Sequence, residues 1–196
     1  MNNIEIKIAS PSDAEAILNI YAPYIKNTAI TFEYEVPSVE EFQKRIIHTL
    51  KKYPYLLALK GEEIIGYAYA GPLHVRAAYA WSVETSIYVK KDYKGKGTGR
   101  TLYEALEYVL KKQNVINSNA CIAYPEKEDQ FLTRDSVKFH SRLGYQKVAE
   151  FHQCAYKFGT WYNMVWMEKF LSEHPRKPQA FRPFEEVRKE FKEWEP

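Results

Sequence analysis

A short glycine-rich loop, between a predicted strand and a predicted helix, is the feature that most restricts the folds open to this chain. Residues 93–100 read Tyr-Lys-Gly-Lys-Gly-Thr-Gly-Arg, with glycine at every second position from 95 to 99. Glycine tolerates backbone angles and close approaches that other residues do not. The alternating run 80–89 predicts a strand before the loop. A helix is predicted after the loop, with one apolar face that contains Leu102, Leu106 and Val109.

Such a loop suggests a phosphate site, and two common templates do not fit it. A dinucleotide fingerprint has a glycine three residues after its second glycine, but Arg100 stands there. The Gly-Lys-Ser/Thr ending of a Walker A loop is absent. Backbone N–H groups at a helix N-terminus can still bind a pyrophosphate, and Lys94, Lys96 and Arg100 add positive charge. Taken alone, the loop is equally compatible with a glycine-rich turn that has a solvated basic rim.

The other segments predict one mixed α/β domain around a single sheet. Alternating apolar residues predict six further strands, at 4–9, in two runs that turn at Gly61, and at 120–124, 146–156 and 161–169. Capping residues and helical spacing predict helices at 10–25, 38–50 and 135–143. We expect the domain to cover residues 1–172. Residues 173–196 are expected to form a proline-containing linker and a short C-terminal helix with Phe184, Val187, Phe191 and Trp194 on one face.

Composition excludes several classes of function. The chain has 196 residues, with 28 basic and 25 acidic side chains, so we expect no nucleic-acid or membrane partner. The two cysteines, Cys121 and Cys154, do not make a disulfide framework and favour a reducing compartment. The N-terminus is too polar for a signal peptide, so a cytoplasmic location is expected. No spacing of histidine, cysteine and acidic residues indicates a metal site.

Several motifs occur together in an order that is typical of one family. They are AYAGP at 68–72, AYAWSVETSIYV at 78–89, LYEAL at 102–106, FHSRLGY at 139–145, NTAITFEYEVPS at 27–38 and KFGTWYNMVWMEK at 157–169. With the glycine loop, they resemble the phosphinothricin acetyltransferase family of the GNAT superfamily of N-acetyltransferases, over about residues 4–170. The resemblance implies a central mixed, mostly antiparallel sheet flanked by helices. It leaves the C-terminal tail and a longer segment at 125–135 unaccounted for.

The resemblance implies a general base at Glu84. From the residues alone, an ordinary surface glutamate is the better interpretation. On strand alternation, Glu84 shares a face with Ser82, Ser86 and Tyr88, and such a face on a central strand needs a wet cleft or paired partners. In that family the proposed base lies in this motif. The base removes a proton from the amine that attacks the thioester.

His140 is the second catalytic candidate. Many related enzymes have a tyrosine here that is thought to protonate the leaving thiolate. Histidine can exchange protons near neutral pH. The alternative is a histidine on a helix face that only bonds to a neighbour.

The resemblance also implies binding residues. Acetyl-CoA is the expected cosubstrate, held by Ile87, Tyr88, Val89, Lys94, Gly95, Lys96, Gly97, Thr98, Gly99, Arg100, Ser136 and Phe139. Lys94 stands where glutamine or arginine is usual. The acceptor is expected to contact Phe32, Glu33, Arg76 and Tyr79.

We therefore predict direct acetyl transfer to a small amino-acid-like amine, such as phosphinothricin, methionine sulfone or methionine sulfoximine. Two alternatives stay open: acetylation of a protein or peptide, and a non-catalytic acyl-CoA-binding module. The aromatic final hairpin and the apolar C-terminal helix predict a homodimer, because together they offer more apolar surface than a monomer usually exposes.

Overall fold

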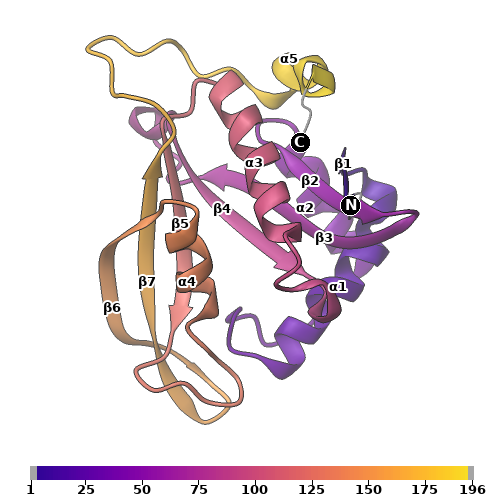
Figure 1. Cartoon of the computed structure of the whole chain (residues 1–196), viewed down its shortest axis with the longest axis vertical. Coiled ribbons are helices and arrows are strands. Elements are labelled where there is room, and N and C mark those ends of the chain that lie inside the picture. Colours follow the sequence, from indigo (N-terminus) through magenta and orange to yellow (C-terminus); the bar gives the residue numbers. More distant parts are fainter. Residues whose placement is uncertain (1–3, 194–196) are drawn as a thin grey trace.

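A computed structural model describes residues 4–193 of the chain as one seven-stranded sheet with helices on both faces (Figure 1). The strands are β1 (Glu5–Ile8), β2 (Tyr55–Lys60), β3 (Glu63–Pro72), β4 (Ser82–Val89), β5 (Asn117–Tyr124), β6 (Gln146–Lys157) and β7 (Thr160–Phe170). The α-helices are α1 (Ala14–Asn27), α2 (Val39–Leu50), α3 (Thr98–Lys112), α4 (Asp135–Arg142) and α5 (Phe184–Val187). Short 3-10 turns lie at Pro11–Asp13, Ala77–Tyr79, Lys91–Tyr93 and Arg188–Glu193. The predicted mixed α/β architecture is confirmed.

Local sequence signals account for several of these boundaries. The Ser38 side chain accepts a hydrogen bond from the Glu41 N–H and so caps α2, as predicted. Gly61 has a positive φ of 61° in the turn between β2 and β3. Glycine adopts this conformation without the strain that a side chain brings, so the hairpin turns there.

The helices divide the core into layers. One apolar cluster lies between α1, α2 and the face of β2 and β3 that carries Tyr55, Leu57 and Tyr67. The other face of this part of the sheet packs against α3, through Leu102, Leu106 and Leu110. A third cluster joins α3 and α4 to β5 and β7. Each helix buries one apolar stripe, as its spacing requires.

The strand order is β1-β2-β3-β4-β5-β7-β6, and β4 with β5 is the parallel pair. Their register extends only from Ser82 opposite Asn117 to Glu84 opposite Asn119. Beyond this point β5 pairs with β7 alone, and Figure 1 shows β4 and β5 diverging. The sheet is therefore mixed and mostly antiparallel, as the resemblance implied, and it opens between its two central strands.

The C-terminal segment packs on the body of the molecule. Phe184, Val187 and Phe191 are buried in the cluster that also contains residues of α3. The predicted continuous helix is shorter than expected, because the α-helical part ends at Val187 and a 3-10 turn follows. Trp194 lies outside the described residues. This helix therefore does not supply the free apolar surface on which the prediction of a homodimer partly depended.

Candidate active site

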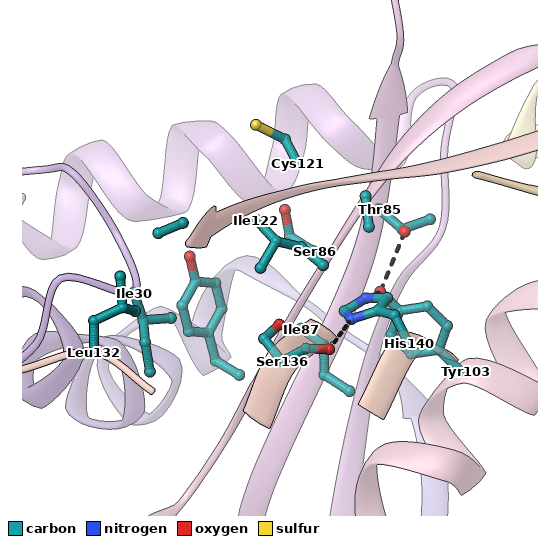
Figure 2. A pocket seen from close by; sticks show the side chains of 13 residues that line it. Ile30, Thr85, Ser86, Ile87, Tyr103, Cys121, Ile122, Leu132, Ser136 and His140 are labelled. Atoms are coloured by element: carbon teal, nitrogen blue, oxygen red, sulfur yellow. Dashed lines mark hydrogen bonds between the residues drawn. The ribbon is translucent and has the colours of Figure 1, made fainter. Parts of the chain in front are cut away.

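The diverging strands β4 and β5 enclose a pocket, which Figure 2 shows from close by. Residues of β4, β5, α3, α4 and two loops line it: Ile30, Thr85, Ser86, Ile87, Tyr88, Tyr103, Ala120, Cys121, Ile122, Ala123, Leu132, Ser136 and His140. Because β4 lacks a partner strand past Glu84 on this side, its backbone can hydrogen-bond to an extended ligand. Of the predicted cofactor residues, Ile87, Tyr88 and Ser136 line this pocket.

Glu84 lies at the last paired position of β4, where the pocket begins. Its partner on β3 is Gly71, and a Cβ atom built at Gly71 would meet nothing within 4 Å. Within residues 4–193 the Glu84 carboxylate has no hydrogen bond or ion pair. Burial raises the pKa of Glu84 above its ordinary value, because removal from water disfavours the charged form. The result is a carboxylate with open space beside it and a strengthened affinity for protons.

His140 is buried, with 3% of its surface exposed. Its Nδ1 lies 2.8 Å from the Ser136 carbonyl oxygen, and its Nε2 lies 2.8 Å from the Tyr103 hydroxyl. Burial lowers the pKa of His140 to about 4, so the ring is neutral at pH 7. A carbonyl oxygen can only accept a hydrogen bond, so Nδ1 carries the proton and Nε2 accepts from Tyr103.

The hydrogen bonds continue from Tyr103 into the sheet. Because Tyr103 donates its hydrogen to His140, its oxygen can only accept from the Thr85 Oγ1, 3.2 Å away, and the single Thr85 hydrogen is shared between this bond and the Asn119 carbonyl at 3.1 Å. Figure 2 shows His140, Tyr103 and Thr85 together at one end of the pocket. The chain of bonds ties α4 and α3 to the point where β4 and β5 separate.

A cysteine also lines the pocket, but its environment does not favour nucleophilic catalysis. Burial, followed by the charge of Glu84, raises the pKa of Cys121 to about 12. A thiol is nucleophilic as the thiolate, and very little thiolate forms at neutral pH with such a pKa. This favours direct attack by an amine over an acyl-cysteine intermediate.

The glycine loop leads directly into α3, as predicted. Gly95 and Gly97 have positive φ angles of 72° and 91°, and Gly97 is the N-cap of α3. A Cβ atom built at either glycine would meet nothing within 4 Å. The loop surface is therefore open, and the unpaired N–H groups of the first helical turn fit a pyrophosphate.

The other predicted cofactor residues surround this loop. Gly99 packs closely on α4, because a Cβ atom there would lie 3.0 Å from the Phe139 ring. The ammonium group of Lys94 lies 4.7 Å from the centre of the Tyr24 ring, and that of Lys96 lies 5.7 Å from the Tyr93 ring. The remaining predicted cofactor residues here are Thr98, which is buried, Arg100, which is exposed, and Val89, which is largely buried.

The predicted acceptor residues divide into two groups. Glu33 forms an ion pair with Arg45 at 2.8 Å, and Phe32 packs beside Ala29 and Leu132, near the pocket. Arg76 and Tyr79 lie in the exposed turn before β4 and do not line the pocket. The structure therefore brings Phe32 next to the pocket residue Leu132, whereas Glu33, Arg76 and Tyr79 do not line the pocket.

Sequence reasoning missed several lining residues. Tyr103 occupies an apolar position of an amphipathic helix, where an aromatic residue is most often core. Ile30 and Leu132 come from loops that carry no regular pattern. Only the pairing of distant segments reveals these residues.

Residues 4–193 contain neither a candidate metal site nor a candidate membrane span. No group of at least three histidine, cysteine or acidic side chains in this part could hold a metal ion. Nor does any helix there combine the length and hydropathy that crossing a membrane requires.

Comparison with known sequences decides the family. The sequence profile described as "Acetyltransferase (GNAT) domain" matches residues 6–166. The chain belongs to the GNAT acetyltransferase family. It is 30% identical over 185 residues to a phosphinothricin N-acetyltransferase of Streptomyces viridochromogenes, covering 94% of this chain and 96% of the relative. It is 28% identical to an L-amino acid N-acyltransferase of Escherichia coli, covering 87% of this chain and 95% of that one.

Solved structures of GNAT proteins share the fold. A phosphinothricin acetyltransferase from Sinorhizobium meliloti, in complex with acetyl-CoA, has a TM-score of 0.83 at 28% identity, covering 94% of this chain and 97% of that chain. A Salmonella typhimurium protein described as a putative acetyltransferase, with its cofactor acetyl-CoA, has a TM-score of 0.81 at 27% identity, covering 91% and 99%. The resemblance seen in the sequence motifs is confirmed.

Proposed function

We propose that this GNAT protein transfers the acetyl group of acetyl-CoA directly to the amine of a small amino-acid-like acceptor. The observation that carries the proposal is Glu84, a half-buried carboxylate at the separation of β4 and β5 that has no hydrogen bond or ion pair within residues 4–193. The names of the relatives support the acceptor class, since they include phosphinothricin, L-amino acids and methionine sulfoximine or sulfone.

In this proposal Glu84 removes a proton from the acceptor ammonium group. Only the free amine has the lone pair that attacks the thioester carbon. A carboxylate with a raised pKa is a better base than an ordinary glutamate, and a positioned base contributes about 10²–10⁴-fold to a rate. Gly71 lies opposite Glu84 on β3, and the open space at its Cβ position leaves room for the amine beside the Glu84 carboxylate.

We assign His140 to the departing thiolate, together with Tyr103. The neutral ring has no proton on Nε2, so His140 serves first to hold the Tyr103 hydroxyl in place. A proton passed on by His140 itself would require the protonated ring, which its low pKa disfavours. We therefore assign the hydrogen bond to the departing sulfur to the Tyr103 hydroxyl, which turns its hydrogen from Nε2 toward the sulfur as the thioester C–S bond breaks.

Acetyl-CoA supplies an activated acetyl thioester. We assign its pyrophosphate to the N–H groups of residues 95–100 and its pantetheine arm to the free edge of β4 at Ile87 and Tyr88, up to Val89, whose carbonyl already accepts a hydrogen bond from the Tyr24 hydroxyl. Ser136 and Phe139 of α4 are assigned to the other side of that arm. Holding both substrates in one pocket removes much of the entropic cost of their encounter.

A homodimer in the cytoplasm is the setting that we propose. Three aromatic side chains of the β6–β7 hairpin, Phe151, Tyr156 and Trp161, are 50%, 47% and 58% exposed. Tyr156 and Trp161 contact each other, with 5.1 Å between their ring centres, and an exposed aromatic pair is more typical of a protein interface than of a monomer surface. The near balance of charge and the free cysteines are compatible with a reducing compartment.

A panel of acceptors tests the proposal. The purified protein is incubated with acetyl-CoA and free amino acids, methionine sulfone, or short peptides, and the release of free thiol is followed. We expect turnover on the amino acids. Turnover on peptides alone would favour a peptide acetyltransferase, and tight acetyl-CoA binding without any turnover would favour a binding module.

A further inference from the structure

The segment between β5 and α4, residues 125–134, forms one wall of the pocket. Leu132 in this segment is 3% exposed and lines the pocket. Ile30, from the loop between α1 and α2, lines the same part. Figure 2 shows these two side chains together at one end, with His140 and Tyr103 at the other.

The two loops are joined to each other through their backbones. The Ala29 N–H donates to the Phe131 carbonyl at 3.0 Å, so the pocket residues Ile30 and Leu132 each directly follow a member of this bonded pair. The Phe131 ring also stacks on Phe158 of the final hairpin, with 4.3 Å between the ring centres. We call Ile30 and Leu132 the apolar wall.

Asp129 stabilises the observed conformation of segment 125–134. Its carboxylate accepts hydrogen bonds from the N–H groups of Phe131 and Leu132, both at 2.7 Å. It also accepts from the hydroxyl of Tyr162 at 2.7 Å, and Tyr162 is itself buried in the sheet. A wall that is already ordered can discriminate between substrates, because no conformational entropy is lost in ordering it when they bind.

The loop between α1 and α2, which contains Ile30, is also held by polar contacts. The ammonium group of Lys157 donates to the Thr31 carbonyl at 2.7 Å, and the Thr31 hydroxyl lies 2.8 Å from that of Tyr21. These contacts hold the backbone next to Ile30. Both halves of the apolar wall are therefore positioned by polar contacts, which are buried beside Ile30 and partly buried beside Leu132.

The apolar wall lies on the acceptor side of the pocket. Ser86 and Tyr88 share the face of β4 that carries Glu84, and Tyr88 packs in the cluster beneath α1 and α2. Ile30 comes from the loop that joins those two helices. The opposite face carries Thr85, which bonds to Tyr103 of α3, the helix that begins at the proposed pyrophosphate loop. A group on the acceptor, rather than the cofactor arm, meets Ile30 and Leu132.

We propose that Leu132 is a specificity-determining residue, which with Ile30 selects acceptors that have an apolar, uncharged side chain. This inference rests on the proposed function. The residues lining the pocket include no lysine, arginine, aspartate or glutamate, and His140 is neutral. Glu84, at the start of the pocket, is assigned to the acceptor ammonium group. A charged acceptor side chain at Ile30 and Leu132 would lose its hydration without gaining a partner, which is costly. We therefore expect the anionic phosphinate of phosphinothricin to fit this wall less well than an uncharged, methionine-like side chain.

The test compares acceptors that differ only in the side chain. Wild-type kcat/KM is measured for glycine, methionine and glutamate with saturating acetyl-CoA. Leu132→Asn keeps the shape but replaces the apolar group with an amide, and Leu132→Met keeps the apolar character. Gln130→Ala, at an exposed position of the same segment, is the control.

We expect wild type to prefer methionine to glutamate. Leu132→Asn should lower the methionine-to-glycine ratio of kcat/KM about tenfold, since a lost contact in an apolar pocket has roughly this effect. Leu132→Met and Gln130→Ala should keep the ratio. If Leu132→Asn does not fold, Leu132→Phe serves instead, because its larger ring should exclude methionine and still admit glycine.

An unchanged ratio in an active variant, or a wild-type preference for glutamate, would overturn the inference while the proposed function stands. A wild type that acetylates no free amino acid would instead overturn both.

Discussion

The buried position of the Glu84 carboxylate lowers the free energy of unfolding at neutral pH. Its pKa is raised by burial, so the folded state holds this proton more tightly than the unfolded chain does. Stability from this group therefore falls as pH rises from the ordinary value of 4.5 through the raised one. We predict that Glu84→Gln has a higher Tm than wild type at pH 7, and that the difference disappears near pH 4. A Tm equal to or below that of wild type at pH 7 would contradict this assignment.

His140 has the opposite dependence on pH. The unfolded chain binds its proton below the ordinary value of 6.5, whereas the folded protein binds it only near pH 4. Stability is therefore lost as pH falls through this window, by up to about 3 kcal/mol. Urea unfolding of wild type and His140→Gln between pH 7 and 4.5 should show the loss in wild type and a flatter profile in the variant. Parallel profiles would mean that His140 is not the neutral, buried group described above.

The loop before α3 is the element on which cofactor binding depends. Valine at position 97 would be strained, because the backbone there has a φ of 91°. We predict that Gly97→Val raises the acetyl-CoA dissociation constant at least about tenfold, as the N–H groups lose their alignment. Calorimetric titration measures this constant directly.

A matched control separates strain from binding. Gly61→Val places the same residue at a positive φ of 61° in the β2–β3 turn, where a Cβ atom also meets nothing within 4 Å. This variant should lose comparable stability and keep the wild-type constant. Equal acetyl-CoA dissociation constants for the two variants would show that the loop is not part of the cofactor site.

The elements themselves were largely predictable from the sequence. Periodic apolar residues and clear end signals, such as Ser38 and Gly61, set their type and approximate bounds. The pocket was less predictable, because it depends on how far β4 and β5 remain paired, and no local pattern encodes that length. The apolar wall combines residues about 100 positions apart in sequence, which single-sequence periodicity cannot bring together.

At the scale of the whole molecule, the C-terminal segment closes the core rather than extending it. Gln113 at the end of α3 donates to the carbonyls of Lys52 and Arg182, at 2.7 and 2.9 Å. The Trp81 indole N–H donates to the Gln179 carbonyl at 2.6 Å. Two of these bonds tie the tail to separate parts of the domain, at Gln113 and at Trp81, so the predicted partner surface must lie elsewhere.

The β6–β7 hairpin is the remaining candidate for that surface. We predict a particle of twice the chain mass in light scattering at micromolar concentration. Trp161→Glu should shift it to a monomer, because Trp161 is 58% exposed beside Tyr156. Phe170→Glu, at a 55% exposed aromatic position at the other end of β7, is the control and should remain dimeric. A wild type that is monomeric at this concentration would rule out the homodimer.

The most direct measurement is the pH–rate profile of Glu84→Gln with a small amino-acid acceptor and saturating acetyl-CoA. The amide keeps the shape of the side chain but can neither take a proton nor attract the ammonium group. We predict that kcat falls by about 10²-fold or more at pH 7 and that the acetyl-CoA dissociation constant stays unchanged. Higher pH should partly restore the rate, because solvent then deprotonates the amine. A variant that keeps full kcat and only binds the acceptor more weakly would show that Glu84 anchors the substrate and is not the base.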